Sequence, residues 1–235
     1  MTKQILPHDT RSFWIKALLN LPMLKSKHEK ILKLTSATEG RLYPGYVLEK
    51  LYYTGSYPKL TPYIDELFNL AHGSIDLGYK PESILYWLRI CVDSEKVTKQ
   101  EMPKIIKLGK IAQQKNLKPE FIYYELWGFT NLSYLTEQHI SSIVQIMEHT
   151  MTTNLEAYDV FHWLRVNLEI HFYSNKEITQ LLTDLLNKIK GGKKPIDYLV
   201  EMQEKHFQKN PTDIQKIASS IESTHIVGRS YRSKL

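Results

Sequence analysis

Apolar residues recur along the chain in short stripes that have the spacing of a helix face, and these stripes repeat every 37 to 38 residues. Apolar positions one and four residues apart on a helix form a surface that packs against a neighbour. Three aligned columns carry the repeat: Val47, Ile84, Ile122, Val160 and Tyr198; Leu48, Leu85, Tyr123, Phe161 and Leu199; and Leu51, Leu88, Leu126, Leu164 and Met202. The pattern predicts a series of matching helices, one in each repeat.

Each stripe follows a residue that suits the start of a helix. Proline is favoured at the first helical position, because its missing N–H would have no partner there. The predicted starts are Pro44, Pro81, Pro119, Ala157 and Pro195. Two of them stand in the signals Lys80-Pro81-Glu82 and Lys118-Pro119-Glu120, where the acidic residue also faces the positive end of the helix.

A second column of hydroxyl residues lies 17 residues further along each repeat: Thr61, Thr98, Thr136, Ser174 and Thr212. A hydroxyl oxygen at such a position accepts a hydrogen bond from a free backbone N–H of the first helical turn. Glu101 and Glu177 each follow a column member by three residues, which is the pattern of a capping box. Aligned apolar residues come next, namely Phe68, Ile105, Ile143 and Leu181. The column therefore predicts a second helix in each repeat.

The two columns predict an all-α fold, a right-handed solenoid of about six helix-turn-helix repeats of 37–38 residues. The expected hairpins cover residues 7–43, 44–80, 81–118, 119–156, 157–194 and 195–232. The terminal repeats match less well, as is typical of end repeats that cover the core with polar surface. Because each hairpin buries its apolar face only against its neighbours, we expect a single domain over residues 1–235.

Signals of catalysis or of a bound cofactor are missing from the sequence. The nine histidines form no HExxH arrangement, and neither a phosphate-binding glycine motif nor a nucleophile elbow occurs. Cys91, the single cysteine, lies in an apolar run and is expected to be a small buried side chain. No apolar run approaches the roughly 20 residues that span a bilayer. We therefore expect no enzymatic activity, no metal, no cofactor, no small-molecule substrate and no membrane insertion.

The net charge of +6 arises near the N-terminus, since residues 1–60 hold ten basic and four acidic residues and residues 61–235 hold 21 of each. A basic balance favours an anionic partner such as a nucleic acid. Residues 119–187, however, carry nine acidic residues and two basic ones. That stretch leaves a second interpretation open, in which an acidic surface binds a basic protein.

The repeat length and the helix openings resemble those of the octotricopeptide repeat, which belongs to the wider pentatricopeptide class of helical repeats. Lys118-Pro119-Glu120-Phe121 is most similar to the Pro-Pro-Pro-Glu-Trp signature of that family, and Lys80-Pro81-Glu82-Ser83 shares its Pro-Glu. The openings at Pro44 and Pro195 lack the Glu, and the opening at Ala157 also lacks the Pro. The resemblance implies recognition of single-stranded RNA in a mitochondrion or plastid, or a place in an organellar ribosome. A helical scaffold that binds only protein is the alternative.

Basic residues occur at the turns between the expected repeats. All these turns fall on one edge of a solenoid, so their side chains could follow a phosphate backbone. The candidate phosphate-binding residues are Arg41, Lys80, Lys115, Lys118, Lys190, Lys193 and Lys194. In the alternative interpretation, basic residues near helix C-termini only offset the helix dipole.

Aromatic residues and arginines occupy columns beside the apolar stripe of the first helix in each repeat. Aromatic rings and guanidinium planes stack on unpaired bases. The candidates for contact with bases or with partner side chains are Arg89, Tyr86, Tyr124, Trp127, His162 and Arg165. Trp87 and Trp163 are expected instead to fill the space between neighbouring hairpins, since buried area dominates what tryptophan contributes.

The pattern and the resemblance together predict a non-catalytic, RNA-associated helical repeat protein in an organellar ribosome or RNA-processing assembly. Its partners would be RNA, with ribosomal RNA as one candidate, and neighbouring proteins of the assembly. The alternative function is a protein–protein scaffold that binds no RNA. The resemblance implies the mitochondrial matrix, whereas the final residues Ser233-Lys234-Leu235 match a peroxisomal targeting signal.

Overall fold

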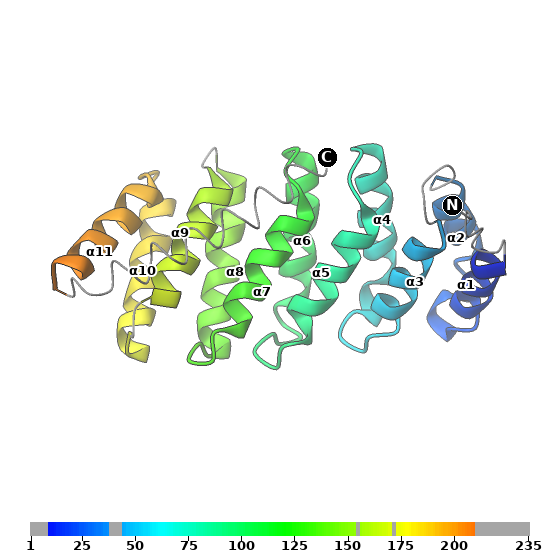
Figure 1. The fold of residues 1–235 in the computed structure, drawn as a ribbon, viewed down its shortest axis with the longest axis horizontal. Helices are drawn as coiled ribbons and strands as arrows, with labels where there is room; N and C mark the ends of the chain where they lie inside the picture. Colours follow the sequence, from blue (N-terminus) through cyan, green and yellow to red (C-terminus); the bar gives the residue numbers. More distant parts are fainter. Residues whose placement is uncertain (1–8, 38–43, 154–155, 171–172, 210–235) are drawn as a thin grey trace, which may run out of the picture. The chain divides into compact units, whose positions relative to one another are not determined.

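The computed structural model describes residues 9–37, 44–153, 156–170 and 173–209. Within these ranges the chain forms eleven α-helices (Figure 1). They are α1 (Asp9–Leu19), α2 (His28–Ala37), α3 (Pro44–Gly55), α4 (Ile64–Asp76), α5 (Pro81–Asp93), α6 (Met102–Gln114), α7 (Pro119–Asn131), α8 (Glu137–Thr152), α9 (Ala157–Ile170), α10 (Asn175–Lys190) and α11 (Pro195–Lys209). Two short 3-10 helices, Pro22–Leu24 and Thr61–Tyr63, precede α2 and α4.

All five predicted starts of the first helices are confirmed, because α3, α5, α7, α9 and α11 begin at the predicted residues. Pro81 and Pro119 occupy the first helical position of α5 and α7, and an acidic residue follows in the first turn of each. The expectation that the first repeat begins at Pro7 and that a last helix follows Thr212 lies outside the described residues.

The second helices begin less uniformly than the hydroxyl column predicts. Ser174 and Glu177 form the expected capping box at α10. Thr136 caps α8 with a histidine in place of the glutamate: its hydroxyl accepts from the backbone N–H of His139 at 3.3 Å, and the His139 Nδ1 accepts from the backbone N–H of Thr136 at 3.2 Å. Both helices therefore have side-chain caps where the sequence places them.

The capping box predicted for Thr98 and Glu101 is wrong. The helix α6 begins at Met102, and no side chain caps its first turn. The Glu101 carboxylate instead accepts from the Ser141 hydroxyl of α8 at 2.8 Å and forms an ion pair with Lys104 of α6 at 3.3 Å. Thr61 also fails to cap, since its hydroxyl donates to the carbonyls of Gly55 and Tyr57 and closes the turn that follows α3.

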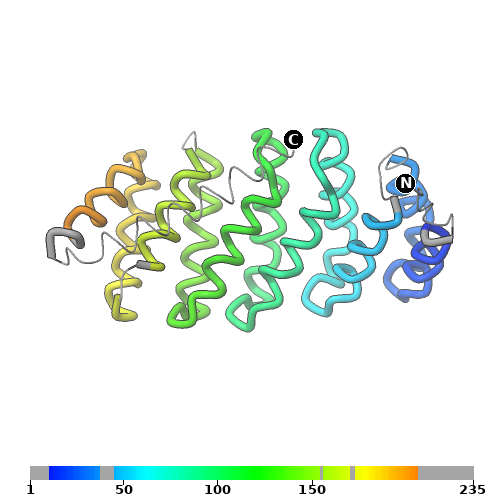
Figure 2. Tube along the Cα trace, viewed as in Figure 1, coloured from blue at the N-terminus to red at the C-terminus, as the bar shows by residue number. Residues whose placement is uncertain are grey.

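The chain divides into two compact units, residues 1–144 and 145–235, and α8 runs through the boundary. In the first unit, α1, α3, α5 and α7 pack in sequence order as one layer, and α2, α4 and α6 form the second layer (Figure 2). In the second unit, α11 packs against α9 and α10. This i, i+2 packing is consistent with a helical repeat array. The right-handed solenoid and the single domain over residues 1–235 stay predictions.

The three apolar columns form the core of each unit. Their members are buried from Val47 to Leu164, and Leu199 of α11 is buried as well. Tyr198 and Met202 are only half-buried, in the last described helix. Among the described residues, every helix is too short or too polar to cross a lipid bilayer.

Candidate functional site

Aromatic side chains line the first-helix layer of the first unit. We define the aromatic strip as Phe13 and Trp14 of α1, Tyr46, Tyr52 and Tyr53 of α3, Tyr86 and Trp87 of α5, and Tyr124 and Trp127 of α7. The Trp14 ring lies 5.6 Å from that of Tyr52 and 5.8 Å from that of Tyr53, centroid to centroid, which joins α1 to α3. The strip therefore continues from one helix of the layer to the next.

Trp87 fills the space between α5 and α7, as the sequence predicts. Its ring centroid lies 5.0 Å from that of Tyr124 in an edge-to-face contact and 5.4 Å from that of Trp127. Tyr86 packs against the same ring at 5.2 Å on the α5 side. Such edge-to-face pairs hold their rings in fixed orientations. The candidates Tyr86, Tyr124 and Trp127 are thus brought together in one cluster.

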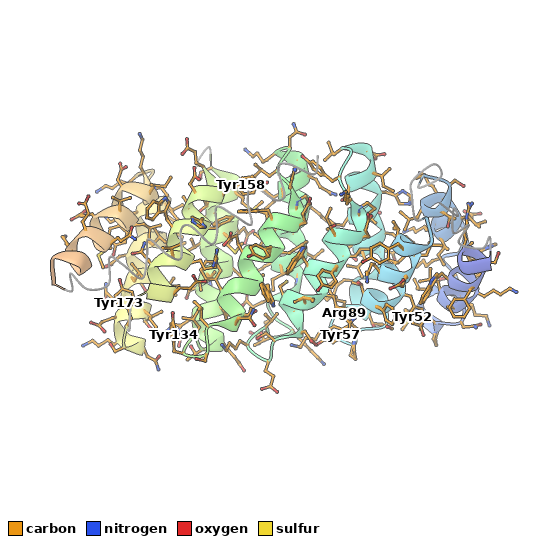
Figure 3. The ribbon with its side chains drawn as sticks, in the orientation of Figure 1. Tyr52, Tyr57, Arg89, Tyr134, Tyr158 and Tyr173 are labelled. Carbon is orange, nitrogen blue, oxygen red and sulfur yellow. The ribbon has the colours of Figure 1, made fainter. Side chains whose placement is uncertain are left out.

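Two cations lie over rings of the aromatic strip. The Lys50 ammonium is 4.5 Å from the centroid of Tyr46 and 5.7 Å from that of Tyr86, and the Arg89 guanidinium is 5.9 Å from the centroid of Tyr53. Figure 3 labels Arg89 on α5 and Tyr52 on the neighbouring α3. These contacts place cations on the strip, and Lys50 also forms an ion pair with Glu49 at 3.4 Å.

The outer rings of the strip are open to solvent. Tyr46, Tyr53 and Tyr86 each keep between 42% and 44% of their surface exposed, and Phe13 keeps 61%. Trp87, Tyr124 and Trp127 are half-buried. The arrangement presents ring surface to a flat ligand, and on α5 the Trp87 ring holds that of Tyr86 in place.

The two candidates on α9 lie in the second unit and differ in exposure. Arg165 is buried, with 9% of its surface exposed, and its guanidinium forms an ion pair with Glu169 one turn further along the helix. His162 is half-buried. The guanidinium of Arg165 is therefore buried and paired, whereas Arg89 lies beside an exposed ring.

The candidate lysines at the turns are all exposed where the structure describes them. Lys80 and Lys118 are the residues immediately before α5 and α7. Lys115 follows α6, and Lys190, Lys193 and Lys194 belong to the turn between α10 and α11. Arg41 lies outside the described residues. Lys80 and Lys118 stand at the positive ends of their helices, so an offset of the helix dipole does not account for them.

Carboxylates accompany these two lysines. Burial raises the pKa of the Glu120 carboxyl, which also lies near Glu82, while Lys118 and Lys80 act in the opposite direction. The edge of the first unit therefore carries lysines beside partly buried glutamates, rather than an uninterrupted basic track.

Two further lysines were missed by the sequence reasoning, and they connect successive hairpins. The Lys59 ammonium donates to the carbonyls of Val92, Ser94 and Val97 at 3.0, 2.8 and 2.9 Å, at the end of α5. The Lys96 ammonium donates to the carbonyls of Thr130 and Leu132 at 3.0 and 2.6 Å, at the end of α7. We call these two residues the lysine ties.

The lysine ties have a sequence signal. Lys59-Leu60-Thr61 and Lys96-Val97-Thr98 lie 37 residues apart, and Tyr134-Leu135-Thr136 occupies the next repeat. The middle residue of each triplet is buried. Burial lowers the pKa of both tie lysines, which is the effect expected when an ammonium leaves water to bind carbonyls.

The described residues offer little for catalysis. Cys91 is fully buried, its thiol donates to the Leu88 carbonyl, and burial raises the pKa of that thiol, so it is not poised as a nucleophile. No group of three His, Cys, Asp or Glu side chains within the described ranges is placed to hold a metal ion.

Comparisons of the chain with protein-family models, curated proteins and solved structures found no match. The described part of the chain is all-helical with sequential packing, and no family is shown for it.

Proposed function

We propose that this chain is a non-catalytic helical repeat protein that associates with single-stranded RNA through the aromatic strip. The observation that carries the proposal is the run of aromatic rings over α1, α3, α5 and α7, which are exposed on α1, α3 and α5 and lie beside Lys50 and Arg89. Every base has a flat face, so aromatic rings bind single strands with little dependence on sequence. The neighbouring cations add attraction for the phosphate groups that such a strand carries.

The exposed lysines at the turns extend this proposal. Lys80 and Tyr86 are six residues apart around the start of α5, which corresponds to about 9 Å along a helix. A strand whose bases lie on the strip could thus place phosphates near Lys80 and Lys118. The overall net charge of +6 also favours an anionic partner.

The proposed setting is an organellar assembly such as a ribosome or an RNA-processing complex in the mitochondrial matrix, with a peroxisomal location as the alternative. The resemblance of Lys118-Pro119-Glu120-Phe121 to the octotricopeptide opening supports the former. Ser233-Lys234-Leu235, outside the described residues, supports the latter.

A protein scaffold is the second candidate function, and the composition of the same strip favours it. Tyrosine, tryptophan and arginine are the residues that contribute most at protein–protein interfaces. A protein partner would cover the strip without needing phosphates, so the dependence of binding on salt separates the two functions.

We expect RNA binding to weaken log-linearly with salt, because association releases counterions from the strand. Binding of a labelled single-stranded oligoribonucleotide, followed by fluorescence anisotropy between about 50 and 200 mM salt, gives the slope. The double variant Lys80→Gln/Lys118→Gln should reduce that slope by about 1.4, since each phosphate contact on a single strand contributes about 0.7. The double variant Lys99→Gln/Lys176→Gln, at exposed positions elsewhere, should leave it unchanged.

An absence of measurable RNA affinity at low salt, together with a stable protein complex, would refute the RNA function and favour the scaffold. An equal slope in the wild type and in Lys80→Gln/Lys118→Gln would remove these two lysines from the interface.

Replacement of an exposed strip residue should weaken RNA binding without unfolding the protein. For Tyr86→Ala we expect a loss of affinity of about tenfold, which corresponds to one lost base–ring stacking contact. Tyr134→Ala is the matched control, because Tyr134 is a similarly exposed tyrosine that lies in the loop before α8. Equal affinities of both variants would show that the strip is not the binding surface.

A further inference from the structure

The turn between α10 and α11 contains a pocket that the proposed function does not use. It has a volume of about 470 Å³ and is lined by Asp184, Asn187, Lys188, Gly191, Lys193 and Tyr198. All six residues belong to the second unit. The volume lies within the range of small-molecule sites, and five of the six lining residues carry a polar or charged group. A polar, charged ligand suits such a pocket better than an apolar one.

The backbone of the turn shapes one wall of the pocket. The N–H groups of Gly191, Gly192 and Lys193 bond to the carbonyls of Asn187, Ile189 and Lys188 at the end of α10. Gly192 adopts a positive φ of 70°, a conformation that glycine tolerates best. Because the last carbonyls of α10 already accept hydrogen bonds, the negative end of this helix is satisfied by its own chain.

The charged groups of the pocket leave a positive excess. The Asp184 carboxylate accepts from the Gln180 side chain at 2.9 Å and lies close enough to Tyr198 to act on its hydroxyl electrostatically. Burial, followed by Asp184 itself, raises the pKa of Tyr198 to about 12, so this hydroxyl keeps its proton at neutral pH.

The lysines of the pocket have no such fixed acidic partner. The Lys188 ammonium lies 4.7 Å from the centroid of the Tyr198 ring, and the nearby Glu201 is paired with Lys205. Lys193 is exposed and forms no ion pair with another described residue. Lys190 and Lys194 flank the turn, and Asp197 follows in the first turn of α11.

The donors present favour a phosphate over a carboxylate as the anion. Lysines act as point charges that suit phosphate oxygens, and the pocket has no arginine to grip a carboxylate with two parallel bonds. The Asn187 amide can donate alongside the lysines. Asp184 has further lone pairs, which can accept from a hydroxyl group of the ligand.

We infer that this pocket binds a sugar phosphate, with Lys188 and Lys193 on the phosphate and Asp184 on a sugar hydroxyl. Two kinds of molecule carry this group: an RNA strand with a 5′ phosphate, and a free sugar phosphate. The second source does not depend on RNA binding at the aromatic strip, which lies in the other unit.

Calorimetric titration with ribose 5-phosphate tests the site directly. The full-length protein should bind it saturably at one site, and unphosphorylated ribose should not bind. Lys193→Gln and Lys188→Gln should each weaken binding about tenfold, the effect of one lost charge-assisted hydrogen bond. Lys176→Gln, an exposed lysine in the first turn of α10, should bind as the wild type does. Unchanged melting temperatures would show that the variants remain folded.

A second titration distinguishes the two sources. If RNA is the source, a 5′-phosphorylated oligoribonucleotide should bind more tightly than its 5′-hydroxyl form, and Lys193→Gln should abolish that difference. If a free sugar phosphate is the source, the two oligoribonucleotides should bind equally while ribose 5-phosphate still binds. An absence of saturable binding of ribose 5-phosphate, or equal affinities of the wild type and both lysine variants, would overturn the proposal. If the protein binds ribose 5-phosphate saturably but has no affinity for RNA, only the proposed RNA function is refuted.

Discussion

Gly109→Ala is expected to lower the free energy of unfolding by about 2 kcal/mol, the cost of adding a methyl group to a packed core. At an exposed helical position the same change would stabilise the protein by up to about 1 kcal/mol, because alanine favours the helix. In α6, however, a Cβ at this position would lie 2.2 Å from the Tyr123 hydroxyl oxygen and 2.9 Å from Leu70 Cδ1. Tyr123 is fully buried, so its ring cannot move aside without disturbing α7.

A double-mutant cycle in urea isolates this steric conflict. Tyr123→Phe removes the closest oxygen, so Gly109→Ala should cost about 1 kcal/mol less in the Tyr123→Phe background than in the wild type. Gln114→Ala, an exposed change in the same helix, serves as the control and should be nearly neutral. If Gly109→Ala stabilises the protein, or if its cost is the same in both backgrounds, the close packing of α6 on Tyr123 is refuted.

Lys59→Met is the second change with a large expected effect, a loss of about 2 kcal/mol of stability. Methionine preserves most of the apolar stem but removes the ammonium, which leaves three carbonyls at the end of α5 without their charged donor. Hydrogen bonds from a charged donor contribute more than neutral ones, and several converge on this single group.

Urea denaturation measures the effect, with Lys99→Met as the matched control in the loop before α6. Lys99 is exposed, so this variant should differ from the wild type by less than about 0.5 kcal/mol. Lys96→Met should destabilise in the same sense, and by somewhat less, because its ammonium binds two carbonyls instead of three. Equal stability of Lys59→Met and Lys99→Met would show that the lysine ties contribute nothing.

The sequence predicted the first helices well because two independent signals coincide there. A proline or small residue opens each of them, and three apolar columns follow in register. The second helices were predicted less well, because a hydroxyl residue can do more than cap a helix. Thr61 closes a turn, and Glu101 binds the side chain of Ser141 on another helix. Such choices depend on neighbours that are distant in the sequence.

Periodicity also located the aromatic columns of the candidate site without showing which members are accessible. Tyr86 and Arg165 lie beside the same apolar stripe, yet the first is exposed and the second is buried and paired with Glu169. The lysine ties were missed because lysine is usually a solvated residue. Their sequence signal is a lysine two positions before the hydroxyl column, which occurs in Lys59-Leu60-Thr61 and again 37 residues later in Lys96-Val97-Thr98.

Each lysine tie joins a hairpin to the one that follows it in the sequence. Lys59 and Lys96 both bind carbonyls that lie between 33 and 38 residues further along the chain. During synthesis on a ribosome, a hairpin therefore emerges before the residues that satisfy its lysine. A nascent chain that stops short of Val92 has the ammonium of Lys59 but none of its acceptors. The lysine of each of these hairpins is therefore satisfied only after the following hairpin has been synthesised.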